Sequence, residues 1–179
     1  MEAAIPMVQF ASILEVQMER EVEVAALFAR RNDSMHRALT KRTFVCFTMG
    51  ELDPVRRDLR LSNGGCPYPY HFRVATGEVE ELQIDAYPLG VRAGADYEVV
   101  EVELEPGDRI VFCSDGIVEA GNGEGKIFGF ENAGDAIRLG CLEGLSAAEL
   151  AARLMAKVDA FSGAEPKWDN QTVVVLRVE

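Results

Sequence analysis

Apolar side chains recur at helical spacing in the first forty residues of the chain. Residues 7–14 carry apolar side chains three or four positions apart, and residues 24–35 continue a similar stripe. Apolar residues at this spacing line one face of an α-helix that packs against a core. We therefore expect two helices here, separated by a break near the acidic residues at 19–23.

From residue 43 the pattern changes to short runs of β-branched and aromatic residues separated by turn-forming residues, which is typical of β-strands. The runs at 109–113 and 172–178 are almost continuously apolar. Continuous apolar character is typical of strands that are covered on both faces, so we expect both to lie in the interior of a sheet. The expected strands are 43–48, 59–62, 70–74, 80–84, 97–104, 109–113 and 172–178.

Two further helices are predicted between the last two strands. Residues 130–139 form the first, and the second follows Ser146, which makes a capping box with Glu149 ahead of apolar positions that reach Phe161. Strands, then a helix pair, then a closing strand indicate an α+β fold of mostly antiparallel sheet. Because no linker, repeat or low-complexity tract interrupts the chain, we expect one domain spanning residues 1–179.

The charge balance narrows the function classes. The chain has 18 basic and 30 acidic residues and a net charge of −12, which disfavours nucleic acid and anionic lipid as partners. No stretch approaches the roughly 20 apolar residues of a membrane span, and no signal peptide is recognisable. The four cysteines include no CxxC pair, which fits a reducing compartment. We expect a cytoplasmic protein with neither nucleic acid nor membrane as a partner.

The first candidate for chemistry is Ser114-Asp115-Gly116, directly after the apolar strand at 109–113. A carboxylate at the end of a buried strand suits metal binding, and the glycine beside it lets the backbone turn closely. The same tripeptide after a strand is often only a turn. The tripeptide alone therefore leaves both interpretations open.

The second candidate is Asp169, within the Trp-Asp-Asn-Gln-Thr sequence at 168–172 that precedes the closing strand. If the two apolar strands are antiparallel neighbours, Asp115 and Asp169 lie at the same end of the sheet. Two carboxylates brought together repel each other unless a cation or a proton compensates. Oxygen ligands of this kind suit Mg²⁺ or Mn²⁺. The alternative is an Asx-type turn that leads into the strand.

Five short motifs follow one another in order over nearly the whole chain. They are Leu61 to Pro67 with its central Asn63-Gly64-Gly65-Cys66, the Pro-Leu-Gly at 88–90, the stretch from Glu105-Pro106-Gly107-Asp108 through Ser114-Asp115-Gly116 to Glu119-Ala120, Ile127-Phe128-Gly129, and Asp169-Asn170-Gln171-Thr172. Together they resemble bacterial metal-dependent (PPM-type) serine/threonine phosphatases of the stage II sporulation protein E branch of the type 2C superfamily. Each motif alone is a weak signal, whereas five in the family order are specific.

This resemblance implies a β-sandwich flanked by helices, with two Mg²⁺ or Mn²⁺ ions at one end. The positions that match the family's metal-binding aspartates are Asp115 and Asp169. In the family, a water between the ions attacks phosphoserine or phosphothreonine in line, without a covalent phospho-enzyme. Asn170 is expected to hydrogen-bond a neighbouring ligand or water. Asn63 and Gly65 are expected to shape a loop beside the site, as Gly116 does within it.

The resemblance also implies a phosphorylated regulatory protein of the anti-anti-sigma type as partner. The family domain begins with a strand carrying Gly-Asp-Val-x-Gly-x-Gly, whose aspartate bridges both ions, whereas this chain opens with residues that match the following helix. We therefore expect a domain that is incomplete at its N-terminus, that binds one ion or none, and that exposes a sheet edge favouring self-association. Cys66 stands where the family usually has histidine.

Three functions are compatible with these patterns. The first is a phosphoprotein phosphatase, and the second is a non-catalytic regulatory or interaction module that keeps the phosphatase fold. The third is a different metal-dependent hydrolase that shares only the acidic end of the sheet. The bridging aspartate separates the first two: a Gly-Asp motif encoded upstream in the full gene would support catalysis, and its absence there would support the interaction module. Substrate scope separates the third, since a phosphoprotein phosphatase should not act on non-phosphorylated esters.

Overall fold

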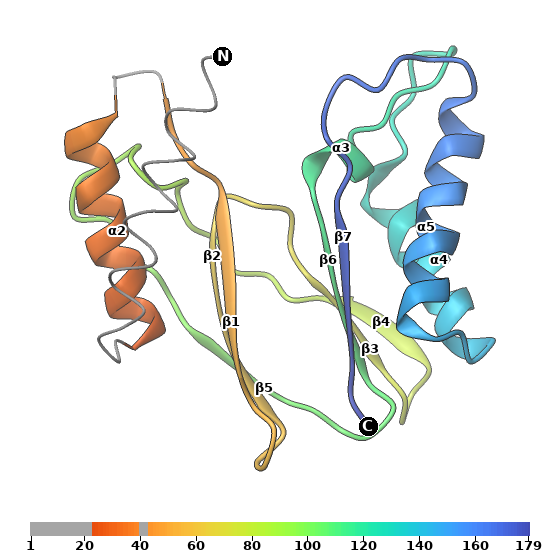
Figure 1. The fold of residues 1–179 in the computed structure, drawn as a ribbon, viewed down its shortest axis with the longest axis horizontal. Helices are drawn as coiled ribbons and strands as arrows, with labels where there is room; N and C mark the ends of the chain where they lie inside the picture. Colours follow the sequence, from red (N-terminus) through yellow and green to blue (C-terminus); the bar gives the residue numbers. More distant parts are fainter. Residues whose placement is uncertain (1–22, 40–42) are drawn as a thin grey trace. The chain divides into compact units, whose positions relative to one another are not determined.

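The computed structural model describes residues 23–39 and 43–179, and the expected helix at residues 7–14 lies outside these ranges. The chain forms two compact units, each built from two separate segments (Figure 1). Among the described residues, the first unit takes 23–39, 43–66 and 84–103, and the second takes 67–83 and 104–179.

The first unit combines one helix with a three-stranded antiparallel sheet. Helix α2 spans Val24–Ala38, and the strands are β1 (Phe47–Asp53), β2 (Asp58–Gly64) and β5 (Val100–Glu103), in the order β1-β2-β5. The predicted apolar stripe of α2 is buried, and Phe28 packs its ring against those of Phe47 and Tyr97. The helix therefore forms because its apolar face has an aromatic cluster to cover.

A buried asparagine fastens α2 to the loop between β4 and β5. The side-chain amide of Asn32 donates to the carbonyl of Arg92 at 2.7 Å, and its Oδ1 accepts from the backbone N–H of Gly90 at 3.0 Å. Asn32 is buried, so these bonds satisfy a side-chain amide that would otherwise lie in the interior without partners.

The second unit contains a four-stranded antiparallel sheet and three helices. The strands are β3 (Tyr70–Arg73), β4 (Glu78–Glu81), β6 (Arg109–Cys113) and β7 (Val173–Arg177), in the order β4-β3-β6-β7. The helices are α3 (Asp115–Val118), α4 (Gly129–Leu142) and α5 (Ala147–Ser162). The predicted capping box is present at the start of α5, where the Ser146 hydroxyl accepts from the Glu149 N–H and the Glu149 carboxylate accepts from the Ser146 N–H.

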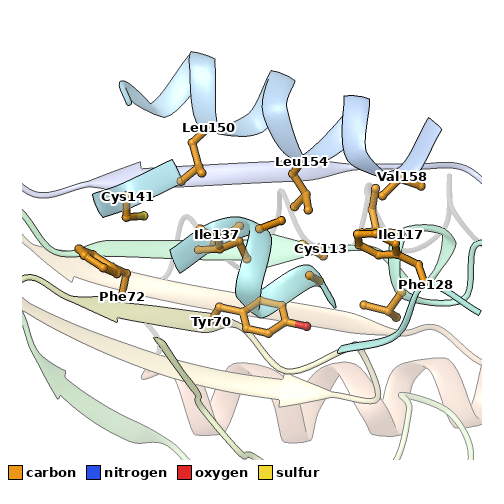
Figure 2. Packing of buried hydrophobic residues seen from close by; sticks show 14 residues of the cluster. Tyr70, Phe72, Cys113, Ile117, Phe128, Ile137, Cys141, Leu150, Leu154 and Val158 are labelled. Carbon is orange, nitrogen blue, oxygen red and sulfur yellow. The ribbon is translucent and has the colours of Figure 1, made fainter. Parts of the chain in front are cut away.

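The core of the second unit lies between its sheet and its helices. Leu150, Leu154 and Val158 lie in a row along α5 and point into the cluster (Figure 2), and all three are buried. Ile137 of α4 and Val111 of β6 are fully buried in the same cluster. Each such side chain contributes about 1.5–3 kcal/mol by leaving water. This core fixes β6, the strand that leads to Asp115.

Asp108 is the main buried polar link in the second unit. Its Oδ1 accepts from the N–H of Val74 at 2.8 Å, and its Oδ2 accepts from the N–H of Glu105 at 3.0 Å and lies 3.0 Å from Nε2 of His71. Asp108 and His71 are both buried. Burial raises the pKa of a carboxyl, but the hydrogen bonds from Val74, Glu105 and His71 outweigh it and hold the pKa of Asp108 below its usual range.

One expectation about the sheet is wrong. The closing strand was expected in a sheet interior, but β7 lies at the end of the sheet that the described residues form, and 54% of Val174 is exposed. Val173 and Val175 pack against the core on one face, while Val174 points away from it. An apolar run indicates that both faces of a strand are hydrophobic. It does not determine how many other strands pair with that strand.

The remaining expected elements form with shifted boundaries. The run at 43–48 contributes only a bridge from Val45 to Leu89 before β1 begins at Phe47. The run at 80–84 becomes β4 at 78–81, and the run at 97–104 shortens to β5. The α+β class with antiparallel sheets is confirmed. None of the helices in the described ranges is long and apolar enough to cross a bilayer.

Candidate metal site

The ends of β6 and β7 carry the two candidate aspartates. The strands are antiparallel neighbours with Cys113 opposite Val173, so Asp115 follows β6 at the same end at which Asp169 precedes β7. The backbone N–H of Ser114 donates to the carbonyl of Thr172 at 3.0 Å and extends the pairing beyond the strands. The strand pairing required by the metal hypothesis is therefore confirmed.

Ser114 and Gln171 tie the two segments together. The Ser114 hydroxyl donates to the carbonyl of Asn170 and accepts from the N–H of Thr172, both at 2.9 Å. The Gln171 side-chain amide donates to the carbonyl of Gly116 at 3.2 Å. Neither residue was assigned a role from the sequence, although a hydroxyl residue directly after a buried strand is a recognisable candidate for such a bond.

Gly116 allows the two segments to approach closely. A Cβ at this position would lie 2.5 Å from the carbonyl oxygen of Asn170 and 3.3 Å from the carbonyl carbon of Asp169. The obstructing atoms are backbone atoms, which cannot rotate away as the end of a side chain can. The expected turn at 114–116 is in fact the start of the short helix α3, which begins at Asp115.

Replacing Gly116 with alanine is expected to destabilise the fold by about 1–3 kcal/mol, because the new methyl group forces the 169–171 backbone away. Urea unfolding followed by circular dichroism measures the change. Gly121→Ala is the matched control, since its Cβ would meet nothing nearer than 3.9 Å. Equal unfolding free energies for the two variants would contradict the close approach.

Both candidate carboxylates are exposed and only partly occupied by hydrogen bonds. Oδ1 of Asp115 accepts from the N–H of Gly116 at 2.9 Å, and Oδ1 of Asp169 accepts from the N–H of Asn170 at 2.7 Å. Neither carboxylate forms an ion pair with any residue of the described ranges. Two uncompensated negative charges at one end of a sheet favour a bound cation.

Two hollows flank Asp169. One has a volume of about 160 Å³, and Gly116, Glu119 and Trp168 also line it. The other has a volume of about 400 Å³, and Met155 and Trp168 also line it. Glu119, which stands in the Glu-Ala motif, was not assigned to the site from the sequence.

The ligand set around Asp169 is small. Within residues 23–39 and 43–179, no three His, Cys, Asp or Glu side chains gather closely enough to hold a metal ion. The donors at the end of β6 and β7 are carboxylate oxygens. They fit a hard cation that keeps several waters and takes one or two protein carboxylates, as Mg²⁺ does, and they do not fit a closed metal cage.

Asn63 and Gly65 belong to the first unit, whereas both aspartates belong to the second. Asn63 is buried, accepts from the N–H of Cys66 at 3.0 Å and donates to its carbonyl at 2.9 Å. Gly65 has a φ of +85°, and a Cβ there would lie 2.5 Å from Cγ of Pro88. Both residues shape the loop after β2. The expectation that this loop lies beside the site stays a prediction.

Comparisons with known proteins agree on one kind of domain. A family model described as stage II sporulation protein E matches residues 1–179. Among curated proteins, no match is found. The structure is similar to the SiaA-PP2C domain of Pseudomonas aeruginosa, with a TM-score of 0.84 and 22% identity, covering 98% of this chain and 69% of that one.

Two further solved structures extend the likeness. The PP2C phosphatase domain of SpoIIE from Bacillus subtilis, with a fragment of its regulatory domain, matches with a TM-score of 0.75 and 21% identity, over 97% of this chain and 50% of that one. The catalytic domain of the serine/threonine phosphatase PstP, in complex with two manganese ions, matches with a TM-score of 0.67 and 18% identity, over 96% and 80%. The chain thus spans half the length of the SpoIIE chain that it matches, and it has the PP2C fold.

Proposed function

Because the chain belongs to the stage II sporulation protein E family and has the PP2C fold, we propose that it is a metal-dependent phosphatase domain acting on phosphoserine or phosphothreonine. The observation that carries this proposal is that the segments bearing Asp115 and Asp169 adjoin the same end of the β6–β7 pair. The manganese in the PstP structure, which shares the fold, supports the choice of cation.

The roles of the residues follow from their contacts. Asp115 and Asp169 supply carboxylate oxygens to Mg²⁺ or Mn²⁺, and the bonds of Ser114 and Gln171 hold the two segments that carry them in a fixed arrangement. Gly116 permits the close approach. When bound, such ions lower the pKa of water and neutralise charge on phosphoryl oxygens.

The proposed substrate is a phosphorylated regulatory protein of the anti-anti-sigma type in the cytoplasm. This substrate class is what the resemblance of the ordered motifs to the family implies, and the chain belongs to that family. The net charge of −12 also favours a protein partner over nucleic acid. The partner supplies the phosphorylated side chain, and the charged end of the sheet is the part of the second unit that suits a phosphoryl group bound through cations.

A second candidate is a non-catalytic interaction module with the same fold. The observation that favours it is the small ligand set, since the described residues bring together no group of three metal-binding side chains. A module of this kind would bind its protein partner without a metal requirement. The two candidates therefore differ in their response to Mn²⁺.

Titration of the 179-residue chain with Mn²⁺ by calorimetry, together with a phosphatase assay, tests the proposal. For a phosphatase domain with this ligand set we expect one weakly held Mn²⁺ per chain and a slow Mn²⁺-dependent turnover of p-nitrophenyl phosphate just above background, because two carboxylates alone hold an ion loosely. Tight uptake of two ions with rapid turnover would show that further residues complete the site. No response to Mn²⁺ in either measurement would favour the interaction module.

A further inference from the structure

Trp168 is the sole tryptophan of the chain, and 86% of it is exposed. An indole is among the largest apolar surfaces that a side chain offers, and folded proteins normally bury most of it. It directly precedes Asp169, one of the two candidate metal ligands. A ligand that binds at Asp169 is therefore expected to lie close to a large exposed apolar side chain.

The segment that carries Trp168 is anchored on both sides. Before it, Nζ of Lys167 lies 2.6 Å from Oδ1 of Asp159 in α5, and the N–H of Glu165 donates to the carbonyl of Ser162 at 3.1 Å. After it, the bonds of Ser114 and Gln171 described above hold residues 170–172. The indole is therefore presented to solvent by a segment with fixed ends.

The two hollows beside Asp169 share Trp168 as a lining residue. Trp168 and Asp169 thus line both hollows. A phosphorylated side chain that reaches Asp169 brings its neighbouring residues close to Trp168, since adjacent Cα atoms are only 3.8 Å apart along an extended peptide.

A second exposed apolar side chain lies on a neighbouring loop. Residues 121–127 form a tight turn closed by the bridge between Gly121 and Ile127, and 61% of Ile127 is exposed. This loop approaches the Trp168 segment, because a Cβ on Gly123 would lie 3.5 Å from Oε1 of Glu165. Exposed carboxylates, among them Glu119 and Glu165, lie on or beside these two loops.

The charges of these loops favour a basic partner segment. Glu119 and Glu165 are exposed and form no ion pair within the described ranges, whereas Lys126 and Lys167 are already paired with Glu124 and Asp159. The two lysines therefore offset carboxylates of their own, and the remaining acidic charge is available to a ligand.

We propose that Trp168 and Ile127, together with Glu119 and Glu165, form a docking surface for the polypeptide segment that flanks the phosphorylated residue of the substrate. The segment places an aliphatic or aromatic side chain on the indole and a basic side chain near the two glutamates. This inference rests on the proposed phosphatase function, and it makes Trp168 a determinant of which phosphorylated segments the domain binds.

Fluorescence anisotropy with labelled peptides tests the docking surface. The first probe carries phosphoserine flanked by one leucine and two arginines. The second probe keeps the phosphoserine but has serine in place of the leucine and glutamine in place of each arginine. We expect Trp168→Ala to weaken binding of the first probe about tenfold, the loss typical of a central aromatic contact. Trp168→Phe should retain most of the affinity, and the second probe should bind weakly to every form.

The matched control is Val55→Ala, which truncates a side chain that is 90% exposed in the first unit and should leave peptide binding unchanged. Calorimetry with Mn²⁺ on the same variants separates this inference from the proposed function, because Trp168→Ala keeps both aspartates. Unchanged peptide affinity in Trp168→Ala, or no binding of the first probe by the wild-type chain, would overturn the docking surface even if Mn²⁺ is bound. Trp168-dependent peptide binding without Mn²⁺ uptake would support the surface and reject the metal-dependent phosphatase.

Discussion

Replacing Asp169 with asparagine is expected to abolish detectable Mn²⁺ binding by this chain. Loss of a group that merely orients a metal ligand costs about 10–100-fold in affinity, and loss of a ligand itself costs at least as much. An asparagine keeps the shape of the side chain but removes the negative charge, so the effect isolates the electrostatic contribution. Asp115→Asn should act in the same direction. Isothermal titration calorimetry provides the measurement.

The fold should tolerate the Asp169 substitution. Without a cation, the two carboxylates at this end repel each other, so neutralising one should leave the unfolding free energy within about 0.5 kcal/mol of the wild-type value. Asp135→Asn is the chemical control, because Asp135 is an exposed aspartate of α4 in the same unit. If all three variants bind Mn²⁺ as the wild-type chain does, the ion lies elsewhere and the site assignment is wrong.

Asp108→Asn is expected to destabilise the protein by about 2–4 kcal/mol. The carboxylate accepts hydrogen bonds on both oxygens, from Val74 on one and from Glu105 and His71 on the other. An amide has only one acceptor oxygen, so its NH₂ group must face at least one backbone N–H. Two donors then meet in a buried place, and neither finds water.

The pH dependence of stability provides a second test of Asp108. Its pKa is depressed in the folded state, so its contribution is fully present above the ordinary aspartate value of about 3.9 and is lost as the pH falls through the folded-state value. The asparagine variant lacks this contribution at every pH. The difference in unfolding free energy between wild type and variant should therefore narrow below about pH 4.

Urea unfolding at several pH values, followed by circular dichroism, measures both effects, with Asp135→Asn again as the exposed control. A difference that stays constant from pH 6 to about pH 2.5 would mean that Asp108 does not carry the acid sensitivity. The neighbours to consider are His71, which contacts Asp108, and Glu80, whose Oε1 lies 3.5 Å from Nδ1 of His71. Variants of these two residues would then identify the responsible group.

The sequence predicted the elements that local patterns determine. The α5 capping box forms as expected, because Ser146 and Glu149 need only each other and the backbone between them. The metal hypothesis assumed that β6 and β7 are antiparallel neighbours, and this pairing is confirmed. The family resemblance rested on the order of motifs, and the family match over residues 1–179 confirms it.

The features that sequence reasoning missed depend on contacts between distant residues. Ser114 bonds to Asn170 and Thr172, more than fifty positions away, and a serine after a strand has many other possible partners. The edge position of β7 depends on which strands are left to pair with it, which no property of residues 172–178 encodes. No prediction was made from the sequence for the burial of Trp168, and hydrophobicity alone does not indicate that this side chain is exposed.

The divided second unit also affects the order of folding events. Strands β3 and β4 are joined by a short turn and can pair early. Strand β3 must also pair with β6, with Tyr70 opposite Val111, and β6 lies about 40 residues further along the chain. Closing such a loop costs entropy before any contact compensates it, and non-local pairing of this kind slows folding. Residues 84–103, which belong to the first unit, thus help to set the rate at which β6 joins its sheet, although they contribute no strand to it.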